Sequence, residues 1–273
     1  MNPAGQEQVA RVDRSRDWQG LYRLLAIGAI AGFAAGFAAG LWTRIAMRVS
    51  GFLTSERNRH LLTEADAAVG EITFEGTFFL AMVSATVGLF GGVVYVAVRN
   101  WLPRSPLLRV AACGLLPLAI FGFILMDANN PDFQRFGPAW LNVPMFCLTF
   151  LIYGVLVHLV AERLDAWLPR LTLARATGWR GILSTLVLIP FGLLGALSVL
   201  PALFIAVSVG GEAAAIFAAM VLLYALARIV RRLAGDGGVM APVLQRAGAL
   251  SILIPGAVGV CLTVNGVVGI FAS

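Results

Sequence analysis

The stretch GAIAGFAAGFAAG, residues 28–40, has a glycine at every fourth position. Residues four apart lie on the same side of an α-helix, so this spacing predicts a helix with a row of positions that lack a side chain. The glycines of this row are Gly28, Gly32, Gly36 and Gly40. In lipid, such a row lets two helix backbones approach closely. The stretch therefore predicts a membrane-spanning helix that packs tightly against a neighbour.

A second row of small residues with the same spacing occurs later in the chain, at Ser84, Gly88 and Gly92. It lies in another uncharged apolar run, residues 77–98. We expect the two rows to face each other in a hairpin formed by the first two membrane spans. Packing is the expected role of both rows, ahead of a groove for a lipid tail or a substrate.

The composition places the whole chain in the same class. Of its 273 residues, 59% are hydrophobic and only 12% are charged, and the mean hydropathy is +0.87. A soluble protein of this size cannot bury so much apolar surface around one core. We therefore predict an all-α, polytopic transmembrane helix bundle in a lipid bilayer. Residues 1–20 are expected to form a flexible cytoplasmic tail, and residues 21–273 a single helical domain.

Seven apolar runs can be distinguished, and none alternates polar with apolar residues as a membrane β-strand does. Their approximate limits are 24–43, 77–98, 107–126, 140–161, 182–209, 213–227 and 247–271. The fifth run contains Pro190 and Pro201, so it is either one kinked helix or a broken pair of helices. Seven spans are therefore the prediction, with six and eight as the alternatives.

The distribution of arginine predicts the orientation of the chain. All 20 basic residues are arginine, and with a cytoplasmic N-terminus fifteen of them fall on inner segments and five on outer segments. The positive-inside rule therefore favours a cytoplasmic N-terminus and an extracytoplasmic C-terminus, in the plasma (inner) membrane. The pI near 10.0 follows from arginines scattered through short loops, so no nucleic-acid partner is expected.

Two arginines depart from this bias. Arg44 and Arg48 follow Trp42 at the predicted outer end of the first span. The larger outer loops, residues 49–76 and 127–139, supply acids that can pair with them. Structural ion pairing is the first expectation, and an anion site for a lipid phosphate or an acidic solute is the second. The candidate ligand-binding residues are Arg44, Arg48, Glu71, Glu75, Asp127, Asp132 and Arg135.

The predicted spans contain little other chemistry. No acidic or basic residue lies near the middle of a span, which counts against a proton-driven carrier. His158 and Glu162 lie one turn apart near the inner end of the fourth span, and this spacing favours a local contact over a proton relay. Asn142 and Asn265 are expected to form interhelical hydrogen bonds. The two histidines and three cysteines lack the spacing of a zinc or iron–sulfur site, so no metal or cofactor is expected.

Three functions remain open from the sequence. The first is transport or binding of a small anionic or amphiphilic compound, such as an anionic lipid, at the outer arginine and acid cluster. The second is a non-catalytic subunit or assembly factor that packs through glycine rows, against another membrane protein or in a homo-oligomer. The third is an outer-leaflet lipid-modifying enzyme. A glycine surface left uncovered in the isolated chain would favour the second, and two converging outer carboxylates would favour the third.

Overall fold

The computed structural model describes residues 3–55, 58, 73–103, 105–126, 129–167, 190–195, 197 and 241–272. Every element in these ranges is a helix. In chain order they are α1 (Pro3–Phe52), α2 (Phe74–Val98), η2 (Arg99–Trp101), α3 (Pro106–Leu125), α4 (Pro131–Arg135), α5 (Ala139–Trp167) and α9 (Ala241–Ala272).

Five helical segments in this part of the chain are long and apolar enough to cross a membrane. They are Tyr22–Phe52, Phe74–Trp101, Pro106–Phe123, Ala139–Trp167 and Leu253–Ala272. These segments correspond to the first four predicted spans and the seventh. The all-helical fold and the five candidate spans fit a membrane protein. The fifth and sixth predicted spans lie mostly outside the described residues, so the count of seven and the orientation of the termini stay predictions.

The helix boundaries differ from those that the apolar runs predicted. Helix α1 is helical from Pro3, through the segment expected to be a tail, and it continues to Phe52, into the predicted loop 49–76. The predicted loop 127–139 contains the short helix α4. Polar caps explain where α2 and α4 begin. The Thr73 hydroxyl accepts from the Gly76 amide at 3.2 Å, and the Asn130 side chain accepts from the Asp132 amide at 2.8 Å. The division into a tail and one domain stays a prediction.

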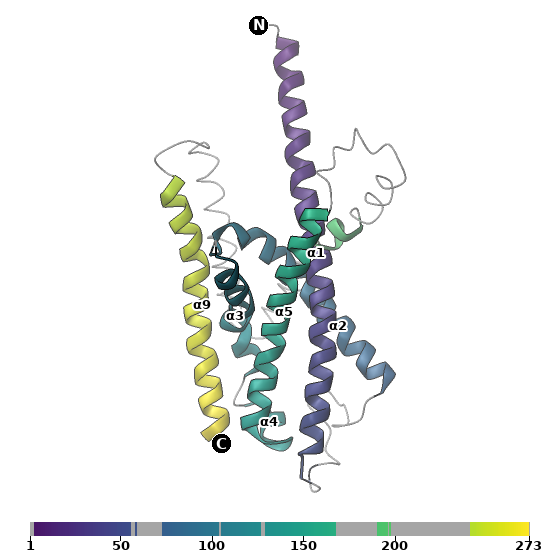
Figure 1. Ribbon diagram of the computed structural model, residues 1–273, viewed down its shortest axis with the longest axis vertical. Coiled ribbons are helices and arrows are strands. Elements are labelled where there is room, and N and C mark those ends of the chain that lie inside the picture. The colour runs from purple at the N-terminus through teal and green to yellow at the C-terminus, as the bar shows by residue number, and fades with distance from the viewer. Residues whose placement is uncertain are drawn as a thin grey trace.

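The spans lie side by side, and α1 extends past the other helices at its N-terminal end (Figure 1). Helix α1 packs against α2 and α5, and α3 packs against α5 and α9. The order across the bundle is therefore α2, α1, α5, α3 and α9. We name the two ends of the bundle after α1, as the Tyr22 end and the Phe52 end. Helix α4 lies at the Phe52 end (Figure 1).

The two rows of small residues form the seam between α1 and α2. Along this antiparallel seam Gly28 faces Gly92, Gly32 faces Gly88, Gly36 faces Ser84, and Gly40 faces Ala81 and Ser84. A Cβ atom added at Gly28 would lie 2.7 Å from the carbonyl oxygen of Gly92, and one added at Gly40 would lie 2.8 Å from Cα of Ala81. Side chains do not approach this closely, so the two backbones are in direct contact because these positions lack a Cβ.

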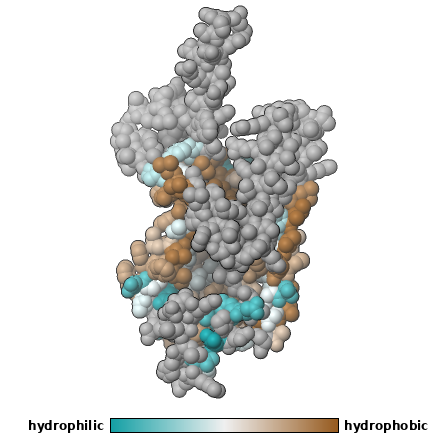
Figure 2. Space-filling view, turned by 180° about the vertical axis from the view of Figure 1, so that it is seen from behind, coloured by the Kyte–Doolittle hydropathy of each residue, from teal (hydrophilic) through white to brown (hydrophobic). Residues whose placement is uncertain are grey.

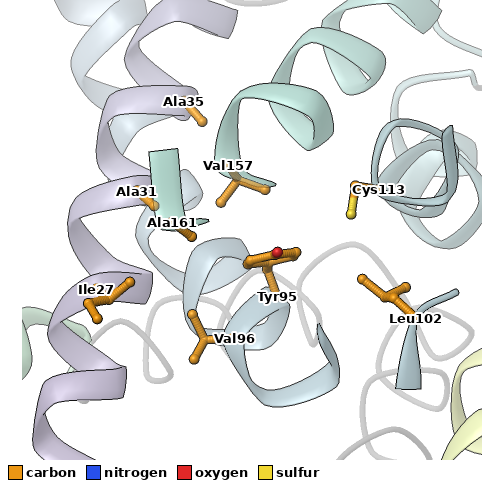
Figure 3. Packing of buried hydrophobic residues seen from close by; sticks show 9 residues of the cluster. All are labelled: Ile27, Ala31, Ala35, Tyr95, Val96, Leu102, Cys113, Val157 and Ala161. Carbon is orange, nitrogen blue, oxygen red and sulfur yellow. The ribbon is translucent and has the colours of Figure 1, made fainter. Parts of the chain in front are cut away.

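Buried alanines continue this close packing on the side of α1 that faces α5. Ala31 and Ala35 of α1 belong to an apolar cluster near the Tyr22 end (Figure 3). The other members are Ile27, Tyr95, Val96, Leu102, Cys113, Val157 and Ala161, which come from α1, α2, α3, α5 and the segment after η2. The cluster places Tyr95, a residue with a polar tip, among apolar neighbours.

Large apolar side chains also cover the outside of the bundle. On α2 they are Phe74, Phe78, Phe79, Val83 and Val87, all exposed. Brown apolar residues occupy much of the middle of the described surface in Figure 2, and teal polar residues gather toward the Phe52 end. This distribution is the one expected for helices surrounded by lipid along their middle.

Candidate functional site

The predicted arginines lie on the last turns of α1, at the Phe52 end. Arg48 lies over the ring of Phe52, with its Cζ 4.4 Å from the ring centroid. The Phe52 side chain is 65% exposed. Arg44 contacts the first turn of α2, where its Nη2 lies 3.3 Å from the position that a Cβ on Gly76 would occupy. Glycine at position 76 therefore makes room for the Arg44 guanidinium.

The other candidate residues are spread over the elements near this end. Glu75 is exposed in the first turn of α2, next to the glycine that Arg44 contacts. Asp132 and Arg135 belong to α4, and the carbonyl of Arg135 accepts a 2.9 Å hydrogen bond from the side chain of Asn58. The described structure thus ties the segment after α1 to α4. The two remaining candidates, Glu71 and Asp127, lie outside the described residues, so one site that contains all seven stays a prediction.

Neutral hydrogen bonds join the chain segments at the Phe52 end. The buried amide of Asn142 on α5 accepts from the Ser50 hydroxyl of α1 and donates to the carbonyl of Phe136. The hydroxyl of Thr54 accepts from the amide of Gly137 at 3.1 Å, and Gly137 has a φ of +62°, which favours glycine. The expected interhelical hydrogen bond is therefore confirmed for Asn142. Asn265, in contrast, is exposed on α9.

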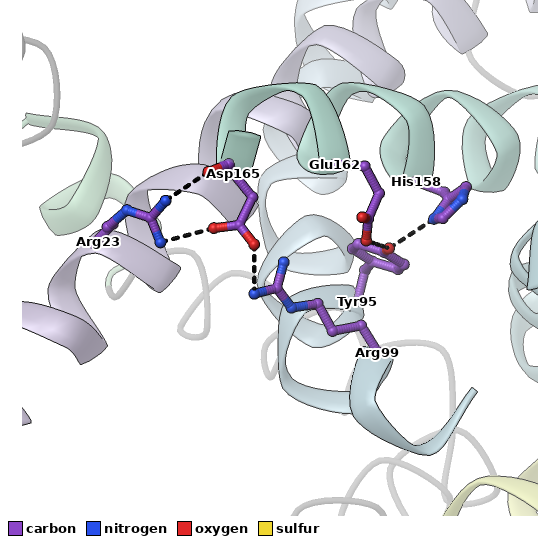
Figure 4. Close-up of polar contacts among 6 residues, drawn as sticks. All are labelled: Arg23, Tyr95, Arg99, His158, Glu162 and Asp165. Atoms are coloured by element: carbon purple, nitrogen blue, oxygen red, sulfur yellow. Dashed lines mark hydrogen bonds and ion pairs between the residues drawn. The ribbon is translucent and has the colours of Figure 1, made fainter. Parts of the chain in front are cut away.

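A charged cluster joins three helices at the Tyr22 end (Figure 4). Nη1 of Arg23 on α1 lies 2.7 Å from Oδ1 of Asp165 on α5, and Nη2 of Arg23 donates to the Asp165 carbonyl at 2.8 Å. Nη2 of Arg99, in η2, lies 3.0 Å from Oδ2 of the same carboxylate. The three side chains are 16%, 18% and 29% exposed for Arg23, Arg99 and Asp165. One carboxylate therefore balances arginines from two different helices.

A second polar group at the same end consists of Tyr95, His158 and Glu162 (Figure 4). The hydroxyl of Tyr95 on α2 lies 2.7 Å from Nδ1 of His158 and 3.4 Å from Oε1 of Glu162, both on α5. Tyr95 and His158 are buried, whereas Glu162 is exposed. The three groups therefore run from the interior of the bundle to its surface.

Sequence reasoning missed this arrangement. The spacing of His158 and Glu162 predicted a local contact on one helix, but the structure connects the two side chains through a tyrosine from another helix. Arg23 and Arg99 were counted only as signals of orientation, and both are paired. Polar side chains at the same end of different spans, such as Tyr95 and Asp165, were the sequence signal that could have indicated these contacts.

The described residues contain no group of three or more histidine, cysteine or acidic side chains that could hold a metal ion. Comparison of the chain with protein-family models, curated proteins and solved structures finds no match. Functional inference therefore depends on the two ends of the bundle.

Proposed function

We propose that the protein binds a small anionic or amphiphilic compound in the membrane, with the anionic group held by Arg44 and Arg48, either for retention or as a step of transport. The observation that supports this function most is the guanidinium of Arg48 over the exposed ring of Phe52. A guanidinium that lies over a ring still directs its N–H groups outward from its edge, where a phosphate or carboxylate can accept two hydrogen bonds.

The position of Phe52 supports an amphiphile as the ligand. Its ring is 65% exposed at the end of a membrane-spanning helix, so it offers an apolar surface beside the cationic group. Arg44 lies one turn before Arg48 on the same helix, and residues at this spacing share a face. Two guanidinium groups and one aromatic ring thus match a charged head group joined to an apolar tail.

Holding the helices together at this end does not require Arg48. The hydrogen bonds of Asn142 with Ser50 and with the carbonyl of Phe136 already join α1 to α5 and to the segment before α5. Arg48 is a cation at the membrane boundary, where neutral hydrogen bonds already join the helices. Its presence there supports a binding role.

The two alternative functions have less support. Both glycine rows contact each other within the hairpin, so they are not available to a separate subunit. The enzyme alternative requires two carboxylates at one pocket. Of its four candidate acids, the structure describes Glu75 on α2 and Asp132 on α4, so this alternative stays a prediction.

Native mass spectrometry of the full chain tests the proposal. The protein is released from nanodiscs that contain equal amounts of phosphatidylglycerol and phosphatidylcholine, and the retained lipids are counted. We expect the wild-type chain to retain the anionic lipid preferentially. Arg48→Ala should lower this retention about tenfold, because it removes charge-assisted hydrogen bonds to the phosphate.

Two further variants make the test specific. Arg48→Lys keeps the charge but loses the planar fork, so it should give intermediate retention. Arg163→Ala removes an exposed arginine of α5 near the Tyr22 end, and this variant should retain as much lipid as the wild type. Unchanged retention in Arg48→Ala, together with a lower free energy of unfolding, would mean that Arg48 has only a structural role.

A further inference from the structure

Three groups that can gain or lose a proton meet at the Tyr22 end, two of them buried and one exposed. His158 is 7% exposed and Tyr95 is 6% exposed, and Glu162 is exposed on the surface of the bundle. The hydroxyl of Tyr95 lies between the imidazole and the carboxylate, 2.7 Å from the first and 3.4 Å from the second (Figure 4). A buried imidazole is thus connected to the surface through one hydroxyl group.

We infer that Tyr95, His158 and Glu162 form a proton relay, in which the carboxylate of Glu162 takes a proton from solvent and passes it through the Tyr95 hydroxyl to the imidazole of His158. The ligand of this site is the proton. The inference is independent of the arginine site at the other end of α1, because it uses none of the same residues.

The hydrogen-bonding capacity of a phenol allows this transfer. A tyrosine hydroxyl has one proton to donate and lone pairs with which to accept. When Tyr95 donates its proton to Nδ1 of His158 at 2.7 Å, its oxygen is able to accept a proton from Glu162. The 3.4 Å separation on that side can shorten, because Glu162 is exposed and its side chain is not confined by packing.

The transfer balances in protons and charge. The protonated carboxyl of Glu162 gives its proton to the Tyr95 oxygen while the original Tyr95 proton moves to Nδ1 of His158. Two O–H bonds break, and one O–H bond and one N–H bond form. The products are a carboxylate, a neutral phenol and an imidazolium. The reverse transfer returns the proton to solvent.

Charged and titratable groups from α5, α3 and η2 act on the members of the relay. The charged groups that act on His158 are the carboxylate of Glu162 on α5 and the guanidinium of Arg109 on α3. Cys113 of α3 and Arg99 of η2 also act on the Tyr95 hydroxyl, and Arg99 is itself paired with Asp165.

The chain has only two histidines, which makes a direct test possible. In a His60→Gln background, His158 is the single imidazole. The full chain is labelled with ¹⁵N-histidine and placed in nanodiscs, and the rate at which His158 exchanges its proton with solvent is measured by NMR line shapes between about pH 5 and 8. Glu162→Gln should lower the rate about 100-fold, the lower end of what a positioned proton donor contributes.

The choice of variants separates a relay from a structural contact. Glu162→Gln keeps the shape and the acceptor oxygen of the side chain but cannot release a proton, and as an exposed substitution it leaves the fold intact. Tyr95→Phe removes the middle member and should slow the exchange as strongly. Arg163→Gln, an exposed change on the same helix as Glu162, is the matched control and should leave the rate unchanged.

Two results would overturn the relay. The first is an unchanged exchange rate in Glu162→Gln, because His158 would then gain its proton without the carboxylate. The second is an imidazole that stays neutral over the whole pH range in the His60→Gln background. If Tyr95→Phe does not fold, Glu162→Gln alone decides between the outcomes.

Discussion

The two ends of the bundle are held together in different ways. At the Tyr22 end, the carboxylate of Asp165 joins α1, η2 and α5 through ion pairs with Arg23 and Arg99. At the Phe52 end, α1 and α5 are joined by neutral hydrogen bonds around Asn142. Arginines occur at both ends, but at the Phe52 end Arg48 contacts an aromatic ring. An arginine at a membrane boundary can therefore serve to join helices at one end and, in our proposal, to bind a ligand at the other.

The largest effect is expected from breaking the seam that links the two ends. In Gly32→Val, the added side chain would overlap the carbonyl of Gly88 and force α1 and α2 apart. The free energy of unfolding in mixed micelles should fall by about 3 kcal/mol, the upper end of the range for overpacked cores. Both ends of the bundle should be destabilised together.

Gly20 provides a matched control for this variant. It lies on the same helix, and a Cβ at this position meets nothing within 4 Å. Gly20→Val should therefore change the free energy of unfolding by less than about 0.5 kcal/mol. Equal effects of the two substitutions would contradict the direct backbone contact at the seam.

A smaller effect is expected at the Tyr22 end. Asp165→Asn removes the charge that balances both Arg23 and Arg99. The free energy of unfolding should fall by about 2–3 kcal/mol, less than for a fully buried pair because water reaches the 29% exposed aspartate. The loss should become smaller as salt concentration rises, because salt screens the ion pairs of the wild-type chain. A loss that does not change with salt would show that charge does not hold this end.

The smallest effect is expected at the Phe52 end. Asn142→Ala leaves the Ser50 hydroxyl and the Phe136 carbonyl without their partner, which should cost about 1–2 kcal/mol in the free energy of unfolding. No formal charge is involved, so this loss should be the same at low and high salt. A clear salt dependence would mean that the nearby arginines also take part in joining the helices at this end.

Different parts of this architecture follow from the sequence to different degrees. The helical membrane class follows from composition, because the apolar runs cannot be buried any other way. The facing of the two small-residue rows follows from their common spacing of four, which is a local property of each helix. The hydrogen bond of Asn142 follows from the cost of an unpaired amide inside a bundle.

The polar groups at the Tyr22 end could not be predicted in the same way. Tyr95 and His158 are 63 positions apart in the chain, and their contact depends on how far α2 and α5 are shifted along each other. Apolar helix faces permit many such shifts, because lipid-facing and packed side chains are of similar type. The same uncertainty concealed the pairing of Asp165 with arginines from two other helices.

The ion pairs of Asp165 also select one alignment of the hairpin among several. Because the glycine rows repeat every four residues, sliding α1 by one repeat would place Gly32 opposite Gly92 and Gly36 opposite Gly88, again without a side chain between them. Such a slide moves α1 by about 6 Å along its axis. Arg23 lies on α1 and Arg99 directly follows α2, so this slide would move one guanidinium relative to the other and disfavour their shared contact with Asp165. The glycine seam by itself permits several alignments of α1 and α2, and the ion pairs of Asp165 favour one of them.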